Sequence, residues 1–142
     1  ADSIALMNEG RIIQTGAPDT LYMKPASLTA ARLLGDVDVF EAEVRDGIAN
    51  TVLGAYSATG FTNGDKVLLL VRPEGVKLER ADAEGALARI IARRVSSGYA
   101  RLTCRLETGQ TLEARASLKE NHRVGDAVRL GVEPAFAHLV SA

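Results

Sequence analysis

Apolar and polar residues alternate in short runs through most of the chain after Gly35. Leu102, Cys104 and Leu106, for example, alternate with arginine and threonine, as in a strand with one buried face. The strands expected from this pattern are residues 37–44, 48–53, 66–72, 76–78, 87–96, 99–106, 111–116, 127–132 and 136–140, with a bend inside 87–96. Many short strands separated by turn residues predict a mainly β fold, a small barrel or sandwich of antiparallel strands.

The first 35 residues have a different pattern. The turn residues at 8–10 separate two short apolar runs, which predicts a hairpin of residues 4–7 against 11–15. Pro18 and Pro25 each suit the first turn of a helix. The second helix would carry Leu28, Ala31 and Leu34 on one face and end at Gly35. Taken alone, this segment is an ordinary peripheral αβ edge.

A motif at fixed spacing runs through the same segment. Its residues are Asn8, Gly10, Ile12, Gln14, Gly16, Pro18, Leu21, Tyr22, Pro25 and Gly35. The segment resembles the part of ABC importer ATP-binding subunits that follows the switch histidine. This resemblance implies that residues 1–35 are the C-terminal tail of a nucleotide-binding domain.

A second motif lies in the β-rich part. Val71-Arg72-Pro73-Glu74 is followed by Val76 and Leu78, and Gly-Asp pairs precede two of the expected strands, at 64–65 and 125–126. These features resemble the regulatory domain that the same importers carry, an OB-like β-barrel called TOBE. The resemblance implies that residues 36–142 form this domain, with the boundary at Gly35-Asp36.

Composition is ordinary for a soluble globular protein. Of the 142 residues, 46% are hydrophobic and 25% are charged, and the net charge is −1. The net charge therefore does not favour binding to nucleic acid or to an anionic membrane. No apolar run approaches the roughly 20 residues that span a bilayer, and no leader pattern is expected. The single cysteine, Cys104, fits a reducing compartment.

Catalytic motifs are missing from the sequence. It contains no phosphate loop, no signature motif and no apolar strand that ends in Asp-Glu. We therefore expect no catalytic, cofactor or metal residues in this fragment, which should neither bind nor hydrolyse ATP. By the resemblance, ATP and Mg²⁺ belong to the parent protein, a transport ATPase. His122 and His138 lack a second ligand at metal spacing, and Cys104 reads as a small core residue.

Two other groups of side chains are candidates for a metal site and for a nucleic-acid surface. Tyr22, Tyr56 and Tyr99 could bind ferric iron, but packing explains them better. Five arginines, Arg89, Arg93, Arg94, Arg101 and Arg105, lack the interleaved aromatic residues of a nucleic-acid surface. We expect a solvated strand face there, with Arg101 or Arg105 paired to Glu113.

The corner formed by Arg72, Pro73 and Glu74 has two interpretations. It is either a strand end fixed by proline or a contact between the regulatory and nucleotide-binding domains. We also expect self-association through Ile12, Ile13, Leu28 and Leu34, because the first 35 residues would have lost their sheet. The expected partners are a second copy of the chain, the rest of the nucleotide-binding domain and membrane permease subunits, at the cytoplasmic face of a bacterial membrane.

The transported substrate is suggested by one stretch. Residues 44–54, VRDGIANTVLG, resemble a segment of ferric-iron-type subunits, which implies iron uptake. Spermidine/putrescine, sulfate and sugar importers share the layout and remain alternatives. A free-standing oxyanion-binding TOBE module and an uncharacterised enzyme are the other two hypotheses.

Overall fold

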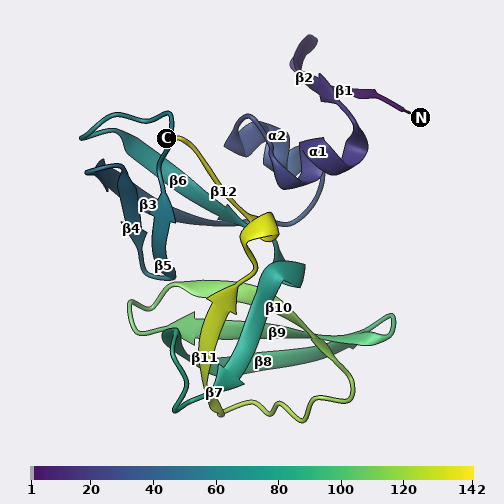
Figure 1. Ribbon diagram of the computed structural model, residues 1–142. Coiled ribbons are helices and arrows are strands. Elements are labelled where there is room, and N and C mark those ends of the chain that lie inside the picture. Colours follow the sequence, from purple (N-terminus) through teal and green to yellow (C-terminus); the bar gives the residue numbers. More distant parts are fainter. Residues whose placement is uncertain (1) are drawn as a thin grey trace.

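The computed structural model describes residues 2–142 and shows a mainly β protein with two lobes and an N-terminal segment above them (Figure 1). The N-terminal segment comprises β1 (Ile4–Asn8), β2 (Arg11–Gly16), α1 (Pro18–Met23) and α2 (Leu28–Leu33). Its hairpin and the start of its first helix at Pro18 confirm the prediction. Within residues 2–142, no helix is long and apolar enough to cross a membrane.

The second helix begins three residues later than predicted. It starts after Ser27, whose Oγ accepts a hydrogen bond from the backbone N–H of Ala30 at 3.1 Å. The predicted start at Pro25 was therefore wrong. A serine that caps a free N–H of the first turn decides where this helix starts, and the proline lies in the loop before it.

The upper lobe is a curled antiparallel sheet with the strand order β12-β6-β3-β4-β5. Its strands are β3 (Asp38–Arg45), β4 (Ile48–Thr51), β5 (Gly54–Ser57), β6 (Lys66–Val71) and β12 (Ala137–Ser141). Strand β5 was not predicted. The strand predicted at 48–53 ends at Thr51, because the Thr51 hydroxyl accepts from the Leu53 N–H at 3.0 Å and donates to the Gly54 carbonyl at 2.9 Å, which turns the chain into β5.

The lower lobe is a second antiparallel sheet with the order β10-β9-β8-β11-β7. Its strands are β7 (Val76–Arg80), β8 (Ala86–Ser96), β9 (Tyr99–Leu106), β10 (Thr111–Ser117) and β11 (Ala127–Val132). The predicted bend in β8 is confirmed, because its register with β9 shifts between Ile90 and Ala92. The alternation in β9 is confirmed as well, since Leu102, Cys104 and Leu106 are all buried.

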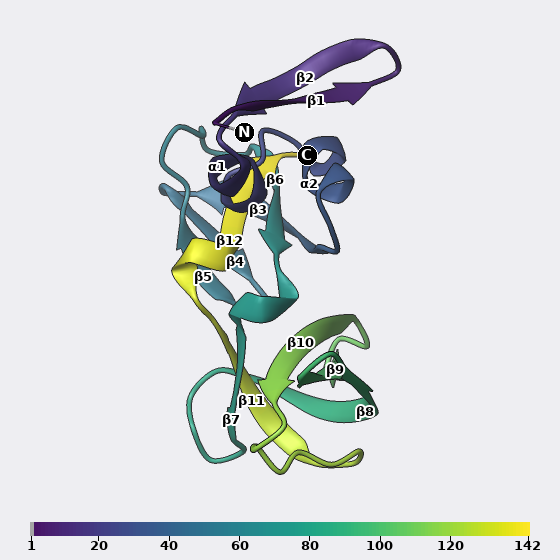
Figure 2. The ribbon, with the colours of Figure 1, turned by 90° about the vertical axis from the view of Figure 1, so that its right-hand side faces the viewer.

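Two corners carry the chain between the lobes (Figure 2). Strand β6 continues through the 3₁₀ turn η1 (Pro73–Gly75) into β7, and β11 continues through η2 (Pro134–Phe136) into β12. The corners are hydrogen-bonded to each other, because the Glu133 N–H donates to the Gly75 carbonyl at 2.8 Å. A Cβ atom on Gly75 would lie 2.3 Å from the Cβ of Phe136, so only glycine fits there.

One hydrophobic core joins the two lobes. Phe40 and Leu69 of the upper sheet pack with Ile90, Leu102 and Leu130 of the lower sheet. The N-terminal segment has its own small cluster around Leu6, Leu21 and Ala30. A further cluster, in which Ala31 packs on Leu70 and Val140, joins α2 to the upper sheet. We call the two lobes together the barrel, and residues 34–37, between α2 and β3, the linker. The N-terminal segment therefore contacts the barrel through side chains as well as through the linker.

Candidate functional site

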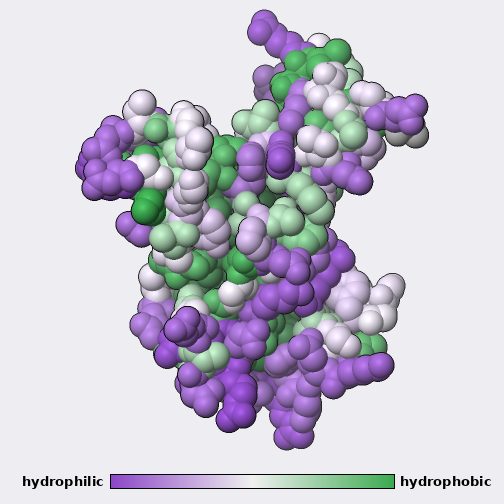
Figure 3. Space-filling view, in the orientation of Figure 1, coloured by the Kyte–Doolittle hydropathy of each residue, from purple (hydrophilic) through white to green (hydrophobic). Residues whose placement is uncertain are grey.

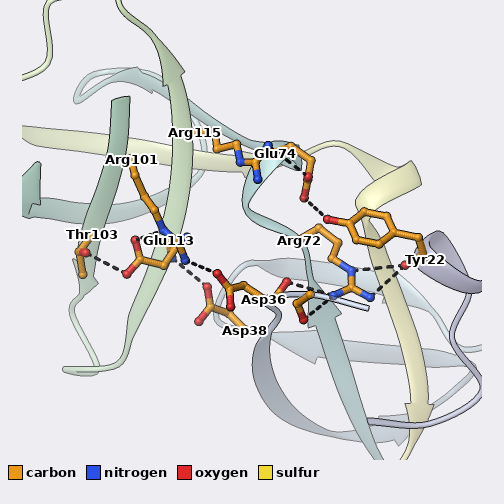
Figure 4. Close-up of polar contacts among 10 residues, drawn as sticks. Tyr22, Asp36, Asp38, Arg72, Glu74, Arg101, Thr103, Glu113 and Arg115 are labelled. Atoms are coloured by element: carbon orange, nitrogen blue, oxygen red, sulfur yellow. Dashed lines mark hydrogen bonds and ion pairs between the residues drawn. The ribbon is translucent and has the colours of Figure 1, made fainter. Parts of the chain in front are cut away.

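The Arg72 side chain lies at the corner after β6, between the N-terminal segment and the barrel (Figure 4). It is only 3% exposed. Its guanidinium donates five hydrogen bonds, all to main-chain carbonyls. These carbonyls and their distances are Tyr22 at 3.3 and 3.2 Å, Ala31 at 3.0 Å, Gly35 at 3.1 Å and Asp36 at 3.0 Å.

Two of these carbonyls explain why a buried positive charge is stable at this corner. Tyr22 and Ala31 lie in the last turns of α1 and α2, where the helix dipole is negative, and the Ala31 carbonyl also accepts from the Leu34 N–H at 3.2 Å. Arg72 therefore caps the C-terminal ends of two short helices at once. Burial lowers the pKa of Arg72, and Tyr22, Glu74 and Asp36 oppose this shift.

The Tyr22 side chain is held from two directions. Its ring centroid lies 4.1 Å from the guanidinium carbon of Arg72, a cation–π contact. Its hydroxyl donates to Oε1 of Glu74 at 2.7 Å. Burial, followed by the hydrogen bond and charge of Glu74, raises the pKa of Tyr22 to about 12. Arg72 and Glu74 thus both bind Tyr22 of the N-terminal segment, and Pro73, which lies between them in the chain, is buried.

A second set of polar contacts joins the linker to the lower lobe. Arg101 of β9 pairs with Asp36 at 2.7 Å and with Glu113 at 3.4 Å. The carboxylate of Asp38 accepts from the Glu113 N–H at 2.8 Å, and burial raises the pKa of Asp38. Glu74 also reaches this lobe, through Arg115 at 3.7 Å. The predicted pairing of Glu113 with an arginine of β9 is confirmed for Arg101.

The remaining candidate residues do not converge on a site. Cys104 is buried, and burial raises its pKa to about 11, as expected for a core residue. Tyr56 packs against the main core, and Tyr99 stacks on Arg115. Across residues 2–142 no group of three or more histidine, cysteine or acidic residues is arranged to hold a metal ion.

The predicted self-association residues divide into two groups. Ile12 is 62% exposed, and Met7, its register partner across the hairpin, is 57% exposed. In contrast, Ile13 and Leu34 pack on the cluster around Leu21, and Leu28 packs against the upper sheet. In Figure 3 hydrophobic atoms are visible beside hydrophilic ones on the N-terminal segment, at the top of the view. Most of the expected patch is thus covered by the chain itself.

Sequence reasoning found Arg72 and Glu74 but missed their partners. Tyr22 stood in the first motif, yet nothing in its spacing pointed to a residue 50 positions away. No motif or spacing in the sequence pointed to Asp36 or Arg115 as residues of this site. The sign that pointed to the corner was an arginine and a glutamate flanking a proline at a strand end, and it identifies the corner but not its partners.

Raising the pH should weaken the fold through two buried groups. The folded pKa of Cys104 rises from 9.0 to about 11, and that of Tyr22 from 10.0 to about 12, so both stabilise the fold while protonated. Their contributions are complete below pH 9 and pH 10 and are lost as the pH rises through the folded values. Melting temperatures measured from pH 9 to pH 12 should therefore fall.

Two variants separate these contributions. Cys104→Ala should flatten the loss between pH 9 and 11, and Tyr22→Phe the loss between pH 10 and 12. Tyr22→Phe should also cost about 1 kcal/mol at neutral pH, because the hydrogen bond to Glu74 is lost. An unchanged alkaline profile in both variants would show that neither group controls the loss.

Two curled antiparallel sheets joined through paired corners define the chain as an OB-like β protein. The family model for the TOBE domain matches residues 69–140, half of the chain. The chain belongs to the TOBE domain family, and it corresponds to the C-terminal TOBE region of ABC importer ATP-binding subunits. This confirms the resemblance that both sequence motifs indicated.

Individual relatives are similar to most or nearly all of the chain. The Fe(3+) ions import ATP-binding protein FbpC of Streptomyces coelicolor is 35% identical over 99% of this chain and 39% of that protein. FbpC of Pseudomonas fluorescens is 33% identical over 98% of this chain and 41% of that protein. The spermidine/putrescine import ATP-binding protein PotA of Mannheimia succiniciproducens is 28% identical over 87% of this chain and 34% of that protein. The chain thus spans about two fifths of the curated relatives it matches.

A solved structure resembles the fold. The cytoplasmic molybdate-binding protein ModG, with molybdate bound, matches with a TM-score of 0.61. The match covers 74% of this chain and 96% of that chain at 12% sequence identity. At this identity the likeness concerns the fold alone, and it confirms the predicted OB-like β architecture.

Proposed function

We propose that the chain is the regulatory region of an ATP-binding subunit that drives the import of ferric iron. The observation that carries this proposal is the extent of the similarity to FbpC of Streptomyces coelicolor, which covers 99% of the chain. The similarity therefore includes the N-terminal segment and not only the TOBE barrel. Six of the relatives that match almost the whole chain are named for Fe(3+) import.

In this proposal the chain has a mechanical role and no catalytic one. The rest of the nucleotide-binding domain binds ATP and Mg²⁺, and the N-terminal segment is its C-terminal tail. Arg72 and Glu74 hold that tail against the barrel, so they form the contact between the two domains. The assembled subunit works with permease subunits at the cytoplasmic face of the membrane.

Uptake measurements test the substrate. Disruption of the gene that encodes this chain should abolish uptake of ⁵⁵Fe(3+) and leave uptake of ¹⁴C-spermidine unchanged, and the intact gene should restore iron uptake. Loss of spermidine uptake alone would assign the subunit to polyamine import. Unchanged uptake of both would contradict the proposed substrate class.

The region also pairs with a second copy of itself in this proposal. The exposed pair Met7 and Ile12 on the N-terminal hairpin supports a contact there. Light scattering at several protein concentrations tests the pairing, and Ile12→Asp should shift a dimer toward monomer. A constant monomer mass would contradict it.

A further inference from the structure

The outer face of the lower lobe contains a hollow that the proposed function does not use. Its volume is about 310 Å³. It lies over β8, β9 and the start of β11, away from the Arg72 corner. Its lining includes Leu87, Arg89, Ile91, Arg105 and Ala127. The hollow therefore combines an apolar floor with two arginines.

Strand alternation places an isoleucine on this outer face. The register between β8 and β9 shifts between Ile90 and Ala92. Ile90 is fully buried in the core, whereas Ile91 is partly exposed and lines the hollow. Because alternate residues of a strand share a face, Leu87 and Arg89 lie beside Ile91. The register is shifted from Ala92 onward, and bulges are common next to functional sites.

The arginines of the hollow are placed unfavourably for the isolated chain. Arg89 and Arg105 are directly opposite each other on neighbouring strands, and like charges in that position are destabilising. Arg89 donates to the Gly125 carbonyl at 2.5 Å. Among the residues that the structure describes, no carboxylate forms an ion pair with either arginine. Glu107 also lines the hollow but pairs with neither.

We propose that this hollow binds an extended, acidic and apolar segment of a protein partner. A carboxylate of the segment lies between Arg89 and Arg105 and relieves their repulsion. Apolar side chains two positions before and after it, on the same side of the extended segment, pack on Leu87 and Ile91. A nucleic acid fits less well, because no aromatic side chain lines the hollow to stack on a base.

A short model peptide tests the proposal by fluorescence anisotropy. The probe is fluorescein-labelled GLTETLG, which places one glutamate between two leucines at alternate positions. The control peptides are GLTKTLG, with the charge reversed, and GGTETGG, without the leucines. We expect only GLTETLG to bind appreciably, and more weakly as salt increases, because part of the attraction is electrostatic.

Three variants locate the binding. Arg105→Glu and Ile91→Ser should each weaken binding of GLTETLG about tenfold or more. Arg11→Glu, which makes the same charge change on the exposed part of β2, should leave it unchanged. Arg105→Glu also replaces a like-charge pair by an attractive one, so its melting temperature should equal or exceed that of the unmodified chain. This variant therefore separates loss of binding from loss of folding.

Several outcomes would overturn the proposal. One is a dissociation constant above about 1 mM for GLTETLG on the unmodified chain. Equal binding of all three peptides is another, as is full binding by Arg105→Glu. Tighter binding of a single-stranded oligonucleotide or of anionic lipid vesicles, again lost in Arg105→Glu, would assign the hollow to a different partner class. The assay measures no transport, so its failure leaves the iron-uptake result independent.

Discussion

Replacing Arg72 with methionine should lower the free energy of unfolding by about 3 kcal/mol. The methionine keeps much of the apolar volume but leaves the carbonyls of Tyr22, Gly35 and Asp36 without this donor. The Ala31 carbonyl loses one of two donors, because it keeps the Leu34 N–H. Each buried carbonyl that loses its partner costs about 1–3 kcal/mol, and partial access of water reduces the sum. Urea denaturation at neutral pH measures the loss.

Two further variants control this measurement. Arg72→Lys should have an intermediate effect, because an ammonium group offers three donors from one point and cannot reach four carbonyls in a fork. Arg11→Met, at an exposed position, should change stability by less than about 0.5 kcal/mol. A loss of less than about 1 kcal/mol for Arg72→Met would show that water replaces the guanidinium.

Removing the N-terminal segment should have an even larger effect without abolishing the fold. Residues 37–142 keep both sheets and the core that joins them, so we expect a single cooperative transition. Leu70 and Val140 lose the cover of α2, however, and Arg72 loses its carbonyl partners. Exposure of two such side chains lowers stability by roughly 3–6 kcal/mol.

Thermal melts of both chain lengths test this prediction. In the shortened chain Arg72→Met should cost close to nothing, because its partners are already gone, so the two changes are strongly non-additive. The same cost in both chain lengths would contradict the role of Arg72 as a cap for the two helices. Absence of a cooperative transition would instead show that the first 35 residues belong to one folding unit with the barrel.

Much of the fold follows from local pattern. The hairpin turn at Asn8–Gly10, the bend in β8 and the alternation of β9 each depend on residues that are neighbours in sequence, and the structure has all three. The start of α2 and the strand β5 were missed for a local reason too. In both cases one hydroxyl, from Ser27 or Thr51, binds the backbone and overrides the weaker apolar pattern.

The contacts of the site could not be predicted in the same way. Arg72 and Glu74 stand out in sequence, but the partners of Arg72 are main-chain carbonyls, which every residue type supplies. The guanidinium finds them only because two helices end at the same point in space. The Asp36–Arg101 pair spans 65 positions and depends on how the linker crosses the barrel.

The paired corners have a mechanical consequence. Strand β6 continues into β7, and β11 continues into β12, through the two corners. The corners pack closely on each other at Gly75 and Phe136. We expect a displacement of the N-terminal segment, which Arg72 holds, to pass to the lower lobe through these two corners.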